Sequence, residues 1–159
     1  MTSRRGASPV VLLTLGTALL TNACTAAGGL PRAASATTAD EAAILQLISE
    51  HYVAAVFQNR DAASVRQGFH PDFHLFVLDD GEIIVAPLEM WLERLGLDGQ
   101  PSTSRVRHEV VFVDVTGDAA VLRTELFVDG EHVYTDYFSL YRFPADGWRI
   151  VTKIFQSHD

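Results

Sequence analysis

Residues 134–155 read YTDYFSLYRF, then PADG, then WRIVTKIF. Both flanking runs are rich in aromatic and β-branched residues, and the four residues between them have turn chemistry, so the stretch predicts a β-hairpin. Asp136 lies inside the first run among aromatic residues, where a carboxylate without a partner would be costly to bury. This acid is therefore expected to be paired, exposed or functional.

The chain before the hairpin supplies helices first and strands afterwards. Apolar residues recur at spacings of three and four from Ile44 onwards, which predicts a helix over 40–58. Shorter helices are expected at 61–69, with Asp61 as N-cap, and at 88–95. Strands are expected at residues 73–78, 82–85, 105–115, 119–128, 132–143 and 148–157. This order predicts an α+β fold, with three N-terminal helices packed on a curved, mostly antiparallel sheet.

The start of the chain has the layout of an export signal. Arg4 and Arg5 precede an apolar run at 10–20, and these 11 residues are too few to span a bilayer as a helix. The only cysteine, Cys24, ends the stretch LTNAC, which resembles the lipobox of bacterial lipoproteins. We therefore expect an exported protein, either periplasmic or held at a membrane by a lipid on Cys24. Ordinary cleavage, with Cys24 discarded or left as a free thiol, is the alternative.

Composition divides the chain into three predicted parts: a signal segment at 1–23, a flexible tether at 24–39 and a folded domain at 40–159. All 20 acidic residues but only nine of the 12 basic residues fall in the domain, which gives it a net charge of −11. Such a surface repels phosphate backbones and anionic lipids, so we expect no nucleic-acid partner and no membrane contact except through Cys24. With one cysteine in the chain, no intramolecular disulfide can form.

Several motifs of the domain resemble those of one family. The first three are a helix tyrosine at Tyr52, an aspartate at Asp61 and a Phe-His-Pro step at 69–71. The others are a Gly-Asp-x-Ala step at 117–120, a Thr-Asp-Tyr-x-Ser-Leu strand at 135–140 and a final Gly-x-Trp-x-Ile-x-x-Lys-x-Phe at 147–155. Together they resemble the nuclear transport factor 2-like fold, also seen in ketosteroid isomerase and scytalone dehydratase, and within it the family labelled "putative lumazine-binding". The resemblance implies a cone-shaped α+β domain. It leaves the function open, because this fold hosts enzymes, binders and dimerisation modules.

A cone of this kind turns one face of each strand inward. Alternate side chains share a face, so Tyr134, Asp136 and Phe138 are expected to point the same way. On the last strand, we expect Trp148, Ile150, Thr152, Ile154 and Gln156 inward, and Arg149, Val151, Lys153 and Phe155 outward. The pocket would be apolar with a few polar groups, as small-molecule sites usually are. The candidate ligand-binding residues are Trp148, Tyr134, Phe138, Ile150, Trp91 and His70.

Asp136 is the centre of the candidate site. Desolvated in such a pocket, it would have a raised pKa and act as a general acid or base, with Tyr52 or His51 donating to a developing oxyanion. The structural alternative, which we favour, is an ion pair across the sheet with a basic residue: Arg123, Arg142 or Lys153.

The remaining candidates also have structural alternatives. His51 on an apolar helix face is more often a satisfied core residue, and Trp91 either belongs to the core or covers the pocket mouth. His70 either lines the pocket or braces the junction between helix and strand. His70 and His74 are four residues apart, but Pro71 breaks the helix that this spacing would need, so we expect no metal site and no cofactor. The other histidines are placed at strand edges or in the tail: His108, His132 and His158.

We therefore predict an exported domain that binds a small, partly apolar molecule. One alternative is an isomerase- or dehydratase-like enzyme that uses Asp136 with His51 or Tyr52. The other is a dimeric protein-interaction module. A homodimer is expected through an aromatic outer face of the sheet, formed by Thr135, Tyr137, Tyr141 and Phe155.

Overall fold

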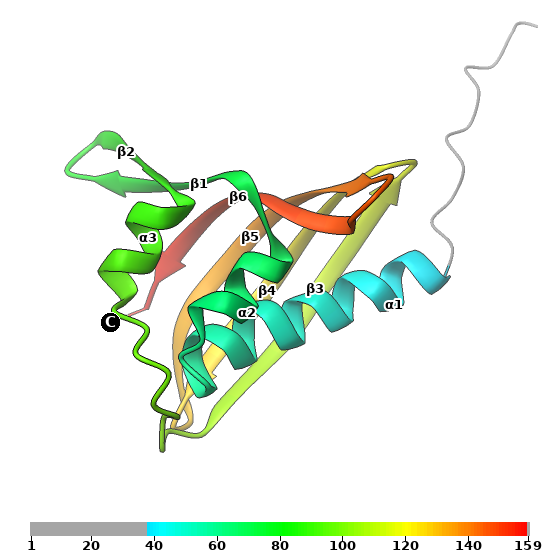
Figure 1. The fold of residues 1–159 in the computed structure, drawn as a ribbon. Helices are drawn as coiled ribbons and strands as arrows, with labels where there is room; N and C mark the ends of the chain where they lie inside the picture. The colour runs from blue at the N-terminus through cyan, green and yellow to red at the C-terminus, as the bar shows by residue number, and fades with distance from the viewer. Residues whose placement is uncertain (1–37, 159) are drawn as a thin grey trace, which may run out of the picture. The chain divides into compact units, whose positions relative to one another are not determined.

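The computed structural model describes residues 38–158 and confirms the predicted α+β fold (Figure 1). The helices are α1 (Thr38–Leu47), the π-helix η1 (Ile48–Gln58), α2 (Ala62–Gly68) and α3 (Leu88–Leu95). The strands are β1 (Phe69–Asp79), β2 (Glu82–Pro87), β3 (Val106–Thr116), β4 (Ala119–Val128), β5 (Glu131–Phe143) and β6 (Gly147–Ser157). No described helix is long and apolar enough to cross a membrane. The predicted signal segment and tether lie outside the described residues, apart from Thr38 and Ala39 at the start of α1.

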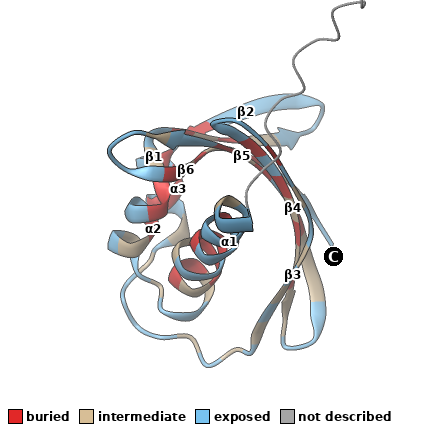
Figure 2. Ribbon diagram, turned by 90° about the vertical axis from the view of Figure 1, so that its right-hand side faces the viewer, coloured by how far each residue is buried: buried red, intermediate tan, exposed pale blue. Residues whose placement is uncertain are grey.

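The six strands form one sheet in the order β2-β1-β6-β5-β4-β3. Neighbouring strands pair antiparallel, except β1 and β6, which run parallel. The sheet curves around α1 and η1, and buried positions on both face each other (Figure 2). The core therefore lies on the concave side of the sheet, and the convex side faces away from these helices.

The first helix changes type at Ile48, where α1 continues into η1. A π-helix closes its turns with hydrogen bonds between residues five apart, and it rarely extends beyond one turn. The last such bond runs from the Asn59 amide to the Ala54 carbonyl at 2.7 Å. The apolar spacing predicted a helix here but not its wider turns, because both helix types bury residues three to five apart. Tyr52, in the middle of η1, is completely buried.

The junction between α2 and β1 comes earlier than predicted. Asp61 caps α2 as expected, since its carboxylate accepts a 2.9 Å hydrogen bond from the Ala63 amide. Gly68 ends the helix and has to be glycine, because a β carbon there would lie 2.3 Å from that of His51. The strand begins directly afterwards, so the predicted start at residue 73 is too late. Pro71 falls where the register between β1 and β6 is interrupted, a place where a missing amide is tolerated.

A β-bulge in β6 changes which residues face the core. Val151 is an extra residue between two successive pairs with β5. One extra residue exchanges the two faces of the strand beyond it. Trp148 and Ile150, before the bulge, are buried as predicted. The prediction is wrong beyond the bulge, where Lys153 and Phe155 face the concave side and Ile154 and Gln156 face outward.

Candidate functional site

Three buried side chains from three elements meet on the concave side of the sheet. The hydroxyl of Tyr52, on η1, donates to Asp136 Oδ2 at 2.6 Å. The ammonium of Lys153, on β6, donates to the same hydroxyl oxygen at 2.7 Å. It also lies 2.8 Å from Oδ1 of Asp136, on β5, as an ion pair rather than an aligned hydrogen bond. The Asp136 side chain is fully buried and that of Lys153 is 6% exposed. We call these residues the Tyr–Asp–Lys triad.

Burial determines the protonation of the triad. Desolvation, reinforced by the neighbouring Asp136 carboxylate, holds the pKa of Tyr52 well above its usual range, so the phenol keeps its proton and donates it. Burial lowers the pKa of the Lys153 ammonium, and the attraction of Asp136 opposes that decrease. One carboxylate thus compensates one ammonium, which makes the burial of both charges tolerable. The ion pair predicted for Asp136 is present, with Lys153 as its partner.

Aromatic rings surround the Lys153 ammonium. Its nitrogen lies 4.7 Å from the ring centroid of Tyr52 and 5.1 Å from that of Phe155. Three further centroids lie 5.8 Å away, those of Trp91, Tyr134 and Phe138. Aromatic rings attract a cation at such distances, so they offset part of the cost of removing the ammonium from water.

The ammonium reaches a cavity of about 200 Å³ between η1, α3 and the sheet. The cavity is lined by Tyr52, Val56, Phe57, Leu75, Trp91, Leu95, Tyr134, Lys153 and Phe155. The lining residues therefore bring one ammonium, two phenols and one indole N–H to an otherwise apolar wall. Asp136 does not line the cavity but lies behind Lys153 and Tyr52, so it acts on a bound molecule only through these two residues.

The structure brings together part of the predicted site. Tyr134 and Trp91 line the cavity, and Trp91 is also buried in the core. Phe138 supports the triad, with its ring centroid 5.0 Å from that of Tyr52.

Trp148 and Ile150 do not line this cavity. The Trp148 indole donates to Asp40 at 3.2 Å, close to the start of α1. Ile150 is completely buried and pairs with Phe69 of the neighbouring strand. Both residues lie before the bulge of β6, whereas the cavity lies beyond it.

The two predicted site histidines also lie outside the cavity. His51 points towards α2, where its Nδ1 lies 3.0 Å from the carbonyl oxygen of Ser64. His70 stacks on Phe143 with ring centroids 4.6 Å apart, which fits the role of a brace at the start of β1.

Lys153 and Phe155 are the cavity residues that the strand alternation missed, because the bulge was not visible in the sequence. One signal pointed to Lys153 all the same: it is the only lysine in the chain. It also belongs to the motif that ends the domain, whereas the other basic residues are scattered arginines.

The convex side of the sheet carries three of the four residues predicted there, and two of these three are exposed. Tyr137 and Tyr141 are 40% and 53% exposed. Thr135 lies on this side but is covered by the side chains of neighbouring polar residues. Phe155 was predicted wrongly, since it lines the cavity.

Comparison with known proteins agrees with this architecture. Residues 39–156 match the model of a family described as "Putative lumazine-binding". The chain belongs to this family. No protein with a curated description matches the chain.

Solved structures similar to this family member share its fold. An NTF2-like protein of unknown function from Shewanella baltica is 24% identical, with a TM-score of 0.65 over 78% of this chain and 98% of that one. One from Silicibacter pomeroyi is 22% identical, with a TM-score of 0.63 over 77% and 100% of the two chains. An NTF2-like superfamily protein from Salmonella enterica is 18% identical, with a TM-score of 0.57 over 78% and 94%. At these identities the likeness establishes the nuclear transport factor 2-like fold alone.

Proposed function

We propose that this chain binds a small, partly apolar molecule through an acceptor oxygen, in the cavity that Lys153 lines. The buried ammonium carries the proposal. Asp136 and Tyr52 hold the nitrogen on one side, and an ammonium has three protons to donate. In the described part of the chain, the Tyr52 hydroxyl is the only acceptor of a hydrogen bond from it, and Asp136 contacts it as an ion pair. A ligand oxygen in the cavity is the natural third partner.

The cavity limits the size of the occupant. About 200 Å³ is less than the roughly 300–1,000 Å³ of sites for drug-sized ligands, which suits a molecule of about one or two fused rings. The aromatic wall favours a planar apolar body. The ammonium favours a carbonyl or carboxylate oxygen at one end, because a charged donor strengthens the hydrogen bond.

The family description supports a ligand of this class. A lumazine is a fused two-ring dione, so it combines a planar body with carbonyl acceptors. Both features match the cavity. The proposal concerns the wider class of planar molecules with an acceptor oxygen, of which lumazine is one member.

An isomerase- or dehydratase-like activity is the second candidate. The lowered pKa of Lys153 favours it, because perturbed groups in a cavity are frequently catalytic. Lys153 and Tyr52 would contact the substrate, and Asp136 would be a positioning residue, because it does not line the cavity. The predicted role of Asp136 as the acid or base is thereby transferred to Lys153, which would stabilise a developing oxyanion.

We also propose that the convex side of the sheet forms a homodimer. Tyr137 pairs with Ile154 across β5 and β6, and both are exposed, 40% and 53% respectively. β5 itself and the strands β3 and β4 add further exposed apolar residues: Tyr141, Val111, Phe112 and Val121. A broad apolar surface of this kind is typical of an interface.

Export of the domain, with Cys24 either lipidated or cleaved off, remains a proposal that rests on the sequence. Residues 1–37 lie outside the part that the structure describes. An exported binding domain would sample small molecules of the cell envelope rather than of the cytoplasm.

The binding proposal is tested by calorimetric titration of the full chain with three probes. Lumazine and 2-naphthoate carry acceptor oxygens on two fused rings, and 2-naphthylmethylammonium carries a cation on the same rings. We expect the two oxygen-bearing probes to bind about tenfold or more tightly than the cation, because Lys153 repels it. Lys153→Met should remove this preference, and Arg149→Met on the same strand should keep it.

A cavity-filling variant locates the binding site without disturbing the triad. Leu95→Trp should abolish binding of both oxygen-bearing probes, because residue 95 lines the cavity and is not a member of the charged pair. Failure of both probes to bind at roughly millimolar concentration, or equal binding of the cation, contradicts the proposal.

A further inference from the structure

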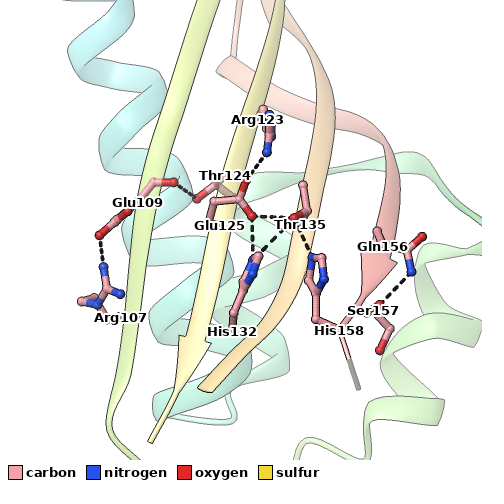
Figure 3. A network of polar contacts seen from close by, with 10 residues as sticks. All are labelled: Arg107, Glu109, Arg123, Thr124, Glu125, His132, Thr135, Gln156, Ser157 and His158. Atoms are coloured by element: carbon pink, nitrogen blue, oxygen red, sulfur yellow. Dashed lines mark hydrogen bonds and ion pairs between the residues drawn. The ribbon is translucent and has the colours of Figure 1, made fainter. Parts of the chain in front are cut away.

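We propose that Glu125, His132 and His158 form a binding site for a divalent transition-metal ion such as Zn²⁺ on the convex side of the sheet. One nitrogen of each imidazole and one oxygen of the carboxylate lie within 4.8 Å of one another. Figure 3 shows the two imidazoles and the Glu125 carboxylate converging around the Thr135 hydroxyl. Two imidazoles and a carboxylate are a donor set that zinc accepts, with a fourth position left for water or another oxygen.

The spacing of the donor atoms fits one small ion. His132 Nε2 lies 2.6 Å from Glu125 Oε2, and His158 Nε2 lies 2.9 Å from Thr135 Oγ1. Zinc–ligand distances of about 2.0–2.2 Å place neighbouring donors of a tetrahedron about 3.3–3.6 Å apart. The separations between the three donor atoms range from 2.6 Å to at most 4.8 Å, which brackets this value. Small side-chain rotations are therefore enough for all three atoms to bind one ion.

Surrounding contacts hold the donors in place. The Arg123 guanidinium bonds the other oxygen of Glu125 and leaves Oε2 facing the imidazoles. The His132 ring lies between two nearly parallel rings, with centroids 4.9 Å from Phe127 and 3.9 Å from His158. Contacts of this kind orient metal ligands and improve affinity. The positive charge of Arg123 acts against a dication, so we expect micromolar rather than nanomolar binding.

The three ligands come from different parts of the sheet. Glu125 lies on β4 and pairs with Thr135 of β5. The chain after β6 continues beside β5, where the His158 amide donates to the Val133 carbonyl at 2.9 Å. Residue 158 lies beyond the stretch that the family model matches, so the family match does not include this ligand. The expectation of no metal site rested partly on His70 and His74, which lie outside this cluster.

Without metal, the same groups form a proton network. His132 and Thr135 then donate to Glu125, and His158 donates to Thr135. Direct measurement of metal binding separates the two arrangements.

The test is calorimetric titration of the metal-free full chain with Zn²⁺, in a Cys24→Ser background so that the only thiol takes no metal. We expect one equivalent to bind in the micromolar range or more tightly. His158→Ala and Glu125→Gln should each weaken binding about tenfold or more. His74→Ala, which removes a half-buried histidine outside the cluster, should leave the affinity unchanged.

His158 follows the last strand, so its loss leaves the sheet and the core intact. Zn²⁺ should raise the melting temperature of the parent chain, because it binds only the folded state, and it should not raise that of His158→Ala. No Zn²⁺ binding by the parent, or equal affinity in His158→Ala and the parent, overturns the proposal.

Discussion

Lys153 Nζ lies 2.8 Å from Asp136 Oδ1, and both side chains are almost completely buried. This contact links the stability of the fold to the chemistry of the cavity. Asp136 compensates the charge of the ammonium from behind, and the ammonium presents its free side to the cavity. Removal of either partner leaves the other as an unpaired buried charge, which is far more costly than the loss of an exposed ion pair.

Asp136→Asn should destabilise the domain by about 3 kcal/mol or more, because the Lys153 ammonium loses its counter-charge in a buried site. Thermal and urea unfolding at neutral pH measure the effect. Asp146→Asn is the matched control, since Asp146 forms an exposed ion pair with Arg149, and its loss should cost less than about 1 kcal/mol. An Asp136→Asn protein as stable as the unmutated chain would show that the carboxylate does not hold the lysine.

The pKa of Lys153 can be read directly, because the chain has a single lysine. In a chain labelled with ¹⁵N at the lysine ζ position, the titration midpoint should lie below the usual value of about 10.4, since burial disfavours the charged form. Asp136→Asn should lower it further by removing the opposing attraction.

The same shift has a consequence for stability. Between the lowered pKa and about 10.4, the unfolded chain binds more protons at Lys153 than the folded chain. This group therefore makes the free energy of unfolding rise with pH across that window. A midpoint at or above 10.4 would mean that the ammonium is solvated, contrary to the buried arrangement.

Tyr137→Glu should convert a dimer into a folded monomer, because it places a charge in the apolar convex surface. Light scattering coupled to size exclusion measures the mass, and circular dichroism verifies the fold. Leu78→Glu is the control, since Leu78 is 72% exposed on β1, at the end of the hairpin with β2. A monomeric unmutated chain at micromolar concentration would exclude this interface.

Cys24→Ser should release the protein from the membrane fraction into the soluble fraction if the cysteine carries a lipid. N-terminal sequencing of the protein purified from its own cells should find a mature chain that begins near residue 24. An unchanged distribution between fractions would favour ordinary cleavage, and retention of Met1 would exclude a cleaved signal.

Much of the fold was predictable because local patterns agreed with one another. Successive strand-like segments joined by short turns that contain glycine predicted the antiparallel part of the sheet. Asp61 marked the start of α2. The π-helix was not predictable, since Tyr52 has the same apolar spacing in either helix type. The parallel pairing of β1 with β6 depends on contacts between distant segments, which no local pattern records.

The sequence predicted which residues form the candidate site better than it predicted how they are arranged. Asp136 and Tyr52 were both expected at the pocket, and the structure joins them by a 2.6 Å hydrogen bond. Lys153 appeared only as one of three possible partners, and the alternation placed it on the wrong face. A single extra residue, Val151, accounts for that error, and a bulge leaves no mark in composition or periodicity.

The most direct test of the binding proposal is a crystal structure of the chain soaked with 2-naphthoate. We expect a carboxylate oxygen of the probe about 2.7–3.2 Å from Lys153 Nζ, with the fused rings packed against Trp91 and Phe155. A probe bound on the convex side of the sheet, or a cavity that stays closed while Lys153 contacts only Asp136 and Tyr52, would contradict the proposed function.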